Sequence, residues 1–196
     1  MSKQKKLRFR KLLGKIKAVV FDRDGTLIKH VEYLNNPKEV ELLPGVQEGL
    51  KFLKSKNIQL FLHTNQSGIG RGLYTLSDVH ACNKRMEELL GLGNNIFERI
   101  CIAGEKPGQT IYYRKPSPNF VIEISRHYNL DFSEIIHVGD RLSDICISLD
   151  VGSKAIGVNT GLVDLRNEVQ QYKNGKFVVF DSFNEVINYM KTSFVI

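Results

Sequence analysis

The sequence contains no hydrophobic run long enough to cross a membrane. Its uninterrupted apolar stretches are all well short of the ~20 residues that a membrane-spanning helix requires. The basic N-terminal stretch is also not followed by the apolar segment and small-residue cleavage site of a secretory signal peptide. We therefore expect a protein with no transmembrane segment that resides in the cytoplasm.

Cysteine is scarce. The three cysteines, Cys82, Cys101 and Cys146, are scattered, odd in number and without CxxC spacing. This pattern favours reduced, partly buried thiols, which are typical of the cytosol. The length of 196 residues suits one domain with a well-buried core. We expect the protein to be a monomer.

Acidic residues are absent from positions 1–17, which hold eight basic residues instead. These are Lys3, Lys5, Lys6, Arg8, Arg10, Lys11, Lys15 and Lys17. Without them, the formal net charge of +7 becomes −1, so the basicity belongs to an arm and not to the body. We predict a basic arm at residues 1–15 and a single domain at residues 16–196. The arm is interpreted as a solvated extension, with contact to nucleic acid or lipid headgroups as the alternative.

Beyond the arm, predicted strands alternate with predicted helices. Strands are expected at 16–21, 58–63, 99–103, 135–138, 155–158 and 177–180, and helices at 45–56, 76–90, 117–128, 142–149 and 182–190. We expect Ser77 to start the second of these helices. The alternation predicts a Rossmann-like α/β fold, with a parallel sheet and helices on both of its faces. Such sheets bind ligands beyond the carboxyl ends of their strands.

Polar clusters follow three of these strands, and a fourth precedes the helix at 117–128. The clusters are DRDGT at 22–26, TNQSG at 64–68, RKP at 114–116 and GDRLSD at 139–144. In a parallel sheet all four converge on one edge, so residues that are distant in sequence can form one site.

The chemistry of such a site can be derived from its residue types. The carboxylates of Asp22, Asp24 and Asp140 provide the hard oxygen ligands that Mg²⁺ prefers. With the charge of phosphate neutralised, Asp22 can attack phosphorus as a nucleophile. Asp24 can protonate the leaving oxygen and then deprotonate water. The Thr64 hydroxyl and the Lys115 ammonium can stabilise the phosphoryl oxygens.

In this order and after these strands, the four clusters resemble the signatures of the haloacid dehalogenase superfamily. The resemblance implies a magnesium-dependent phosphatase with Asp22 as nucleophile and Asp24 as acid/base. It also implies that Thr64 and Lys115 hold the phosphoryl group. Magnesium would then be bound by the side chains of Asp22 and Asp140 and by the backbone carbonyl of Asp24. The intervals between the clusters leave no room for the large cap domain of many members, so we expect an open site.

Finer details resemble the histidinol-phosphate and D-glycero-D-manno-heptose 1,7-bisphosphate phosphatase family. These details are DRDGT, TNQSGIGRG, RKPSP and the stretch LPGV at 43–46. In that family a Cys/His zinc site usually precedes RKP. Here Cys101 is the only cysteine or histidine among residues 100–114. Ile111 and Tyr113 stand where that family has its two late cysteines. A structural zinc site needs four ligands, so we expect no zinc.

The substrate is the least constrained property. We expect substrate contacts from Asn65, Gln66, Ser67, Arg114, Arg141 and Tyr33. Arg114 and Arg141 suit a second anionic group, which favours a small bisphosphorylated sugar of the heptose type over histidinol phosphate. TNQSGIGRG also resembles the 3′-phosphatase domain of polynucleotide kinase-phosphatases, but the near-neutral body makes nucleic acid an unfavoured partner. A non-catalytic binding module is disfavoured because every catalytic position is present.

Three further polar residues leave alternatives open at this stage. Asp144 either caps and orients the helix after GDRLSD or ligates the metal. His63, at a strand end, is interpreted as structural. His30 is equally consistent with substrate contact and with a solvated loop position.

Overall fold

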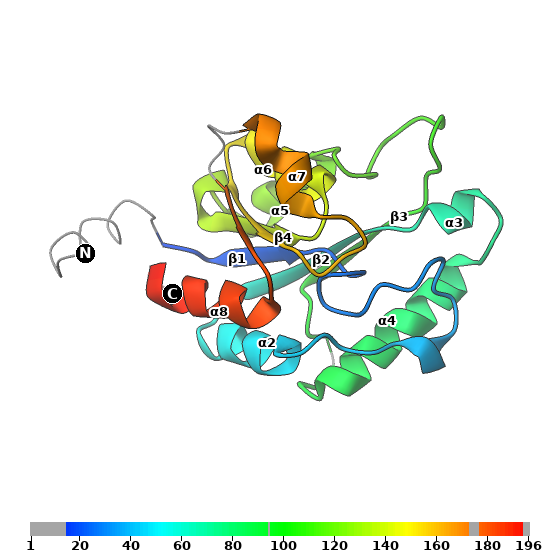
Figure 1. The fold of residues 1–196 in the computed structure, drawn as a ribbon, viewed down its shortest axis with the longest axis horizontal. Helices are drawn as coiled ribbons and strands as arrows, with labels where there is room; N and C mark the ends of the chain where they lie inside the picture. The colour runs from blue at the N-terminus through cyan, green and yellow to red at the C-terminus, as the bar shows by residue number, and fades with distance from the viewer. Residues whose placement is uncertain (1–14, 94, 173–176, 194–196) are drawn as a thin grey trace, which may run out of the picture.

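The computed structural model describes residues 15–93, 95–172 and 177–193. The predicted basic arm lies outside the described residues, apart from Lys15. The part of the chain described forms one six-stranded sheet flanked by helices (Figure 1). This arrangement confirms the predicted Rossmann-like α/β fold.

The sheet is parallel throughout, with the strand order β3-β2-β1-β4-β5-β6. The strands are β1 Ala18–Phe21, β2 Gln59–Asn65, β3 Arg99–Ala103, β4 Ile135–Gly139, β5 Lys154–Val158 and β6 Phe177–Phe180. At the centre, Phe21 of β1 lies opposite Leu62 of β2 and Val138 of β4. Strands β1 and β4 therefore end at nearly the same level, and β2 continues from Leu62 to Asn65; the residues that follow the three strands meet at one edge.

Helices cover both faces of the sheet. They are α2 Val46–Ser55, α3 Ser67–Gly70, α4 Leu76–Leu90, α5 Asn119–Tyr128, α6 Leu142–Val151, α7 Leu165–Glu168 and α8 Phe183–Ser193. Short 3₁₀ turns occur at η1 Pro37–Glu39, η2 Phe132–Glu134 and η3 Val169–Tyr172. In Figure 1, α2, α4 and α8 lie on one side of the sheet and α5 and α6 on the other.

Strand β1 shows why two cores form. Successive side chains of a strand point to opposite faces. Val19 and Phe21 accordingly pack into the core beneath α2, α4 and α8, whereas Ala18 and Val20 pack with residues of α5 and α6. All four side chains are buried, as expected for a central parallel strand.

The predicted elements are all present, with ends shifted by a few residues. Helix α4 begins at Leu76 as predicted, but the predicted capping residue was wrong, because Thr75 and not Ser77 caps the helix. Thr75 Oγ1 accepts the N–H of Asp78 at 3.3 Å, and the Asp78 carboxylate accepts the N–H of Thr75 at 2.8 Å. This reciprocal capping box satisfies two backbone donors that a start at Ser77 would leave free.

No cap domain interrupts the described residues between the polar clusters. Between Asp24 and Thr64 the chain forms η1 and α2 before it enters β2, and between Thr64 and Lys115 it forms α3, α4 and β3. The three cysteines are free thiols, as predicted. Among the described helices, none is both long and apolar enough to cross a bilayer.

Candidate active site

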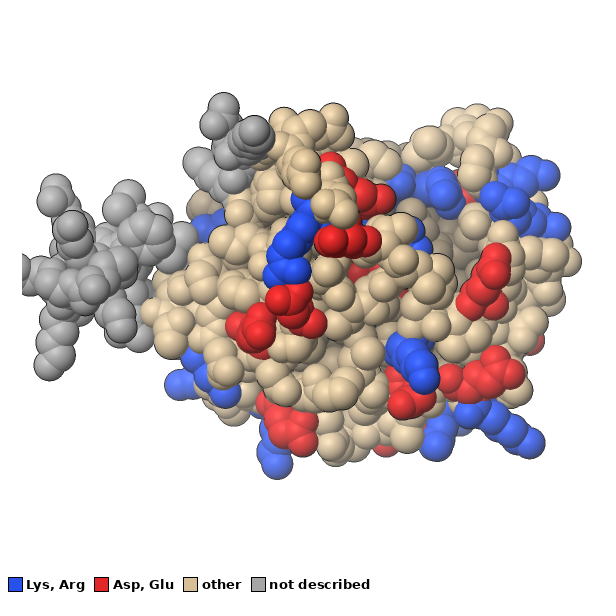
Figure 2. Space-filling view, in the orientation of Figure 1, with Lys and Arg blue, Asp and Glu red and all other residues tan. Residues whose placement is uncertain are grey.

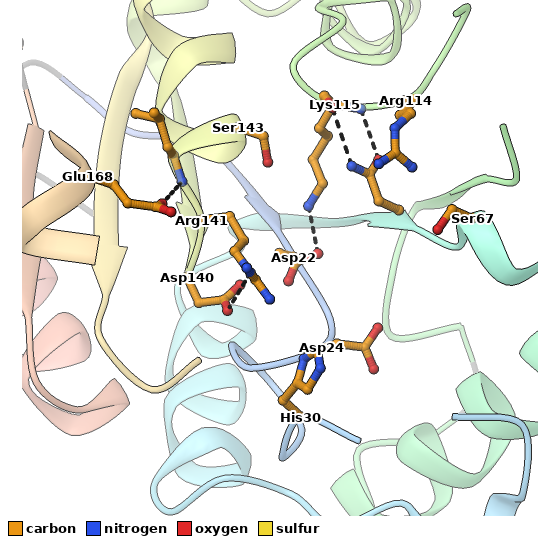
Figure 3. Close-up of a pocket in the computed structure, with 12 residues that line it drawn as sticks. Asp22, Asp24, His30, Ser67, Arg114, Lys115, Asp140, Arg141, Ser143 and Glu168 are labelled. Atoms are coloured by element: carbon orange, nitrogen blue, oxygen red, sulfur yellow. Dashed lines mark hydrogen bonds and ion pairs between the residues drawn. The ribbon is translucent and has the colours of Figure 1, made fainter. Parts of the chain in front are cut away.

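The four polar clusters meet at the carboxyl edge of the sheet around a cavity of about 440 Å³ (Figure 3). The cavity is lined by Asp22, Asp24, His30, Asn65, Ser67, Arg114, Lys115, Asp140, Arg141, Leu142, Ser143 and Glu168. Every cluster contributes at least one side chain to this wall. The predicted convergence of distant residues is therefore observed.

The turn after β1 places two of the acidic side chains. The carbonyl of Arg23 accepts the N–H groups of Leu27 at 2.9 Å and Ile28 at 3.1 Å, which bends the chain back directly after the strand. Gly25 has a φ of +83°, a conformation that a side chain would strain. The turn therefore sends Asp22 and Asp24 to the same edge from a very short segment.

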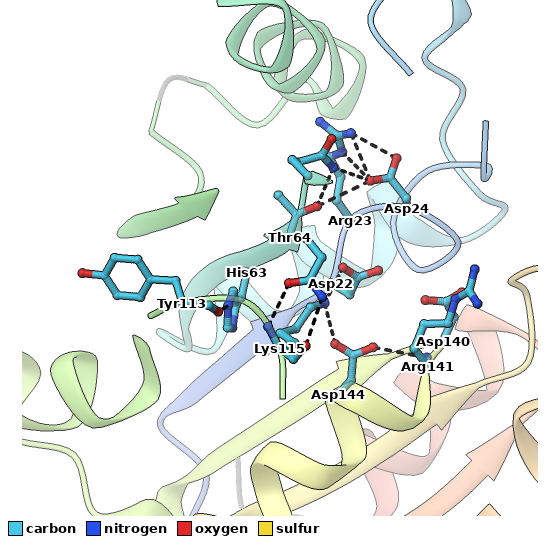
Figure 4. A network of polar contacts seen from close by, with 12 residues as sticks. Asp22, Arg23, Asp24, His63, Thr64, Tyr113, Lys115, Asp140, Arg141 and Asp144 are labelled. Carbon is cyan, nitrogen blue, oxygen red and sulfur yellow. Dashed lines mark hydrogen bonds and ion pairs between the residues drawn. The ribbon is translucent and has the colours of Figure 1, made fainter. Parts of the chain in front are cut away.

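Lys115 lies at the centre of a buried ionic cluster (Figure 4). Its Nζ donates to Asp22 Oδ1 and to Asp144 Oδ1, each at 2.6 Å. Burial alone would lower the pKa of the Lys115 ammonium, but the charges of Asp144 and Asp22 outweigh it and raise that pKa. Lys115 is therefore a fixed cation beside Asp22, in a position to hold an anionic group.

Asp144 serves Lys115 and a helix at once. Its Oδ2 accepts the backbone N–H of Arg141 at 3.2 Å at the start of α6, and its Oδ1 accepts from Lys115. The capping role considered from sequence is thus present, while direct metal ligation stays open.

Asp22, Asp140 and Asp144 offer oxygen atoms that all lie within 4.8 Å of one another. Asp140 is 1% exposed, and neither of its carboxylate oxygens has a hydrogen-bond partner, although Arg141 Nε lies 3.5 Å from Oδ2. Burial, and then the charges of Asp22 and Asp144, raise the pKa of Asp140. Because three carboxylates face a single lysine, the site fits a divalent cation.

Two glycines hold the backbone close around Asp140. A Cβ on Gly25 would lie 2.6 Å from Asp140 Oδ2, and a Cβ on Gly161 would lie 1.8 Å from the same atom. Sequence reasoning identified Gly25 within DRDGT but gave no role to Gly161, which lies after β5 and outside every cluster.

A Gly161→Ala substitution is expected to weaken magnesium binding by about tenfold or more, because the added methyl must displace the Asp140 carboxylate. The measurement is the magnesium concentration that gives half of the maximal rise in Tm. Gly104→Ala is the control, because the atoms nearest to its Cβ would be those of Ile69, at 3.4 Å or more. An unchanged midpoint in Gly161→Ala would show that the position of Asp140 does not depend on this glycine.

Asp24 is held by a network on the other side of the cavity (Figure 4). Arg23 donates from Nε to Asp24 Oδ2 and from Nη2 to Oδ1, both at 3.1 Å. Gln66 Nε2 donates to Oδ2 at 2.8 Å, and Thr64 Oγ1 donates to it at 3.4 Å. Arg23 is 0% exposed and also donates to Asn83 Oδ1 of α4 at 2.8 Å.

This network assigns roles that the sequence did not predict. Gln66, a predicted substrate contact, is 3% exposed, donates to Asp24 and accepts from Tyr74, and it lines a second hollow beyond Asp24. Arg23 and Asn83 were not identified at all. The position of Arg23 between two motif aspartates could have indicated a role at the site. Nothing in the sequence distinguishes Asn83 from any other polar residue of a helix.

Two buried histidines lie near Lys115. Burial, followed by the charge of Lys115, lowers the pKa of His63 well below its ordinary value and the pKa of His137 to about 3. Both rings are therefore neutral near pH 7. His63 Nε2 lies 2.8 Å from the carbonyl of Tyr113, to which it donates as a neutral ring. The structural interpretation of His63 agrees with this position.

The remaining predicted substrate contacts lie around the mouth of the site. Ser67, Arg114 and Arg141 line the cavity (Figure 3). Asn65 lines it as well. Asn65 also grips the backbone of Lys115: its Oδ1 accepts that residue's N–H at 2.9 Å, and its Nδ2 donates to its carbonyl at 3.3 Å.

A second hollow of about 380 Å³ adjoins the first beyond Asp24. Tyr33, also predicted to bind substrate, lines this hollow, and His30 lines both hollows. The position of His30 favours its interpretation as a residue near the substrate.

Two family models match the chain. The one described as haloacid dehalogenase-like hydrolase matches residues 29–146, and the one described as HAD-hydrolase-like matches residues 112–186. Together they cover Thr64, Lys115 and Asp140, which line or adjoin the cavity.

Similar proteins carry one recurrent name. The D-glycero-D-manno-heptose-1,7-bisphosphate 7-phosphatase of Thermosynechococcus vestitus is 30% identical over 75% of this chain and 81% of its own. The D-glycero-beta-D-manno-heptose-1,7-bisphosphate 7-phosphatase of Helicobacter pylori is 32% identical over 70% of this chain and 80% of its own. The crystal structure of the D,D-heptose 1,7-bisphosphate phosphatase from B. bronchiseptica, complexed with magnesium and phosphate, superposes with a TM-score of 0.78. It is 25% identical and covers 90% of this chain and 98% of its own.

Proposed function

The chain belongs to the haloacid dehalogenase-like hydrolase family as a phosphatase, and we propose that it hydrolyses a small bisphosphorylated sugar through a magnesium-assisted aspartyl-phosphate. The observation that carries the proposal is the buried cluster in which the Lys115 ammonium lies 2.6 Å from Asp22, next to the Asp140 carboxylate, which accepts no hydrogen bond. A nucleophile, a fixed cation and a cation-binding carboxylate thus share one wall of an open cavity.

In the proposed first step, an Asp22 oxygen attacks phosphorus, and the bond from phosphorus to the leaving oxygen breaks. Asp24 gives its proton to that oxygen, so an alcohol departs. Asp22 and Asp140, with the backbone carbonyl of Asp24, would hold a magnesium ion whose charge reduces the repulsion between phosphate and carboxylate. Lys115 and Thr64 bind the phosphoryl oxygens and stabilise their charge.

In the second step, Asp24 accepts a proton from water, and the water oxygen attacks the phosphorus of the aspartyl-phosphate. The bond from Asp22 to phosphorus breaks, which releases inorganic phosphate and restores the Asp22 carboxylate and the protonated carboxyl of Asp24. The contacts of Asp24 with Gln66 and Thr64 keep it at the side of the cavity in both steps.

Two arginines support the choice of a bisphosphate. Arg114 and Arg141 both line the cavity that contains Asp22, so a second phosphate on the same sugar meets planar, multidentate donors. Heptose 1,7-bisphosphate is the substrate that fits this pattern and the names of the similar proteins. Glu168 on the same wall would favour the ammonium of histidinol phosphate, which makes that ester the second candidate.

Nucleic acid remains the less favoured partner. On the face shown in Figure 2, acidic and basic side chains are interspersed, with no continuous basic track. A polynucleotide backbone is usually bound along such a track. The single-domain organisation, the monomeric state, the cytoplasmic location and the lack of zinc stay predictions.

We expect heptose 1,7-bisphosphate to give the highest kcat/KM in a panel with histidinol phosphate, fructose 1,6-bisphosphate and a 3′-phosphorylated oligonucleotide. An Arg114→Ala variant should lower that value by about 10- to 100-fold, the loss expected for a charged hydrogen bond, while p-nitrophenyl phosphate changes far less. Arg126→Ala, at an exposed position of α5, is the control. A preference for histidinol phosphate or the oligonucleotide would overturn the substrate, as would an Arg114→Ala variant with unchanged bisphosphate turnover.

A further inference from the structure

Glu105 makes an unusual set of contacts in the loop between β3 and α5. One oxygen of its carboxylate, Oε1, accepts three consecutive backbone N–H groups: those of Tyr112 at 2.9 Å, Tyr113 at 2.7 Å and Arg114 at 3.3 Å. The backbone carbonyl of Glu105 also accepts Arg114 Nη1 at 3.1 Å. A single residue therefore holds both the main chain and the arginine side chain just before Lys115.

Side-chain hydrogen bonds to this backbone segment continue as far as Lys115. The next backbone N–H, that of Lys115, donates to Asn65, and the carbonyl of Tyr113 accepts from His63. Four successive amides, from Tyr112 to Lys115, are thus bound by side chains, three of them by Glu105 of the same loop and the fourth by Asn65 at the end of β2. No strand or helix ladder supplies these partners, since the segment lies between β3 and α5.

The charge state of Glu105 agrees with this geometry. Partial burial would raise the pKa of its carboxyl, but the backbone N–H donors, that of Tyr113 foremost, outweigh the effect and lower that pKa. A charged acceptor makes stronger bonds to amides than a neutral one does. The carboxylate therefore replaces the missing backbone partners of the loop while it remains ionised.

We propose that Glu105 is a positioning residue for the reaction, whose carboxylate fixes the backbone from Tyr112 to Arg114 and so places the Arg114 and Lys115 side chains at the cavity. The inference rests on the proposed function in one respect, namely that Lys115 holds the phosphoryl group. Its Nζ sits 2.6 Å from two carboxylates, so the cluster tolerates little displacement of the Lys115 backbone. A shift of about 1 Å at a reacting group can cost about 100-fold in rate.

The same loop carries a second carboxylate contact, which provides a matched control. Glu123 of α5 accepts the hydroxyls of Tyr113 at 2.9 Å and Tyr112 at 3.4 Å. It anchors the two side chains at the surface and leaves their backbone amides to Glu105. Removing Glu123 loosens the loop without releasing the amides that precede Lys115.

The experiment compares Glu105→Ala, Glu105→Gln and Glu123→Ala by Tm, by hydrogen exchange of the amides at 112–115, and by kcat and KM for p-nitrophenyl phosphate with magnesium. Glu105→Ala should lose exchange protection at 112–114 and lower kcat/KM by about 10- to 100-fold. Glu123→Ala should stay within about threefold of wild type in kcat/KM, even if its Tm falls as much as the Tm of Glu105→Ala does. Glu105→Gln keeps an acceptor oxygen and should recover most of the protection and of the rate.

Several outcomes would overturn the proposal. Faster exchange at 112–114 in Glu105→Ala with unchanged kcat/KM would show that the loop does not position Lys115. A loss of kcat/KM in Glu123→Ala equal to that in Glu105→Ala would show that Glu105 only stabilises the loop as a whole. If Glu105→Ala does not fold, Glu105→Gln carries the test, because its rate should fall only in proportion to its loss of protection. A wild-type protein inactive on any phosphate monoester would instead overturn the proposed function itself.

Discussion

An Asp22→Asn variant is expected to lose at least about 10⁴-fold in kcat on every phosphate monoester, because an amide oxygen cannot act as the nucleophile that forms the phosphoenzyme. The fold should survive the change. Asp22 shares a buried site with Asp140 and Asp144, and its charge contributes to the raised pKa values of both. Removing one of three crowded carboxylates relieves repulsion, which offsets the lost contact with Lys115.

The measurement pairs steady-state turnover with Tm, each with and without magnesium. Without magnesium, the Tm of Asp22→Asn should equal or exceed that of wild type, and magnesium should raise it by less, since one carboxylate ligand is gone. Asp150→Asn, at an exposed position near the end of α6, is the control and should behave as wild type in every arm. Turnover by Asp22→Asn within tenfold of wild type would show that Asp22 is not the nucleophile.

The sequence predicted the fold well because its signal is local and repeated. Each buried strand is a short apolar run, and each long helix shows one apolar face, so period and length identify them. The short elements α3, α7 and the 3₁₀ turns were not predicted, since three or four residues carry no detectable period. The bounds of α4 were predicted as observed, but its cap was misassigned, because Thr75 and Ser77 are both suitable caps and only the position of Asp78 decides between them.

The candidate site was predicted as far as its residues belong to contiguous clusters. Asp22, Lys115 and Asp140 all face one cavity, and they were found because clusters after parallel strands must converge. Residues that act through other residues were missed. Glu105 and Gly161 have no motif, and their importance depends on three-dimensional distances to Lys115 and Asp140 that no spacing in the sequence reveals.

The assignment of Asn65 and Gln66 shows a second limit. Both were expected to bind substrate because they follow β2 within the TNQSG turn. The structure turns Gln66 toward Asp24 and pairs Asn65 with the backbone of Lys115. Neighbouring side chains of an irregular turn point in different directions, so membership of a cluster does not predict which other residues each side chain holds in place.

An Asp24→Asn variant is expected to lower steady-state kcat by about 10²- to 10⁴-fold, the usual contribution of a positioned acid–base group. The two proposed steps should respond differently to the choice of ester. Departure of p-nitrophenolate needs no proton at neutral pH, so the first step should survive on p-nitrophenyl phosphate. The second step needs Asp24 to accept a proton from water, so the phosphoenzyme should accumulate. With a sugar phosphate, whose leaving oxygen needs the proton, even the first step should fail.

Rapid mixing of Asp24→Asn with p-nitrophenyl phosphate should therefore release about one equivalent of nitrophenolate in a burst, followed by slow turnover. The phosphoenzyme should be detectable by intact mass and absent from the double variant Asp22→Asn, Asp24→Asn. Some loss of Tm is also expected, because the fully buried Arg23 keeps only an amide where it had a carboxylate. A dead variant with no burst would mean that Asp24 mainly supports the geometry of the site. Turnover at the wild-type rate would mean that another residue at the cavity acts as the acid and base, and His30, which lines the cavity, is a candidate.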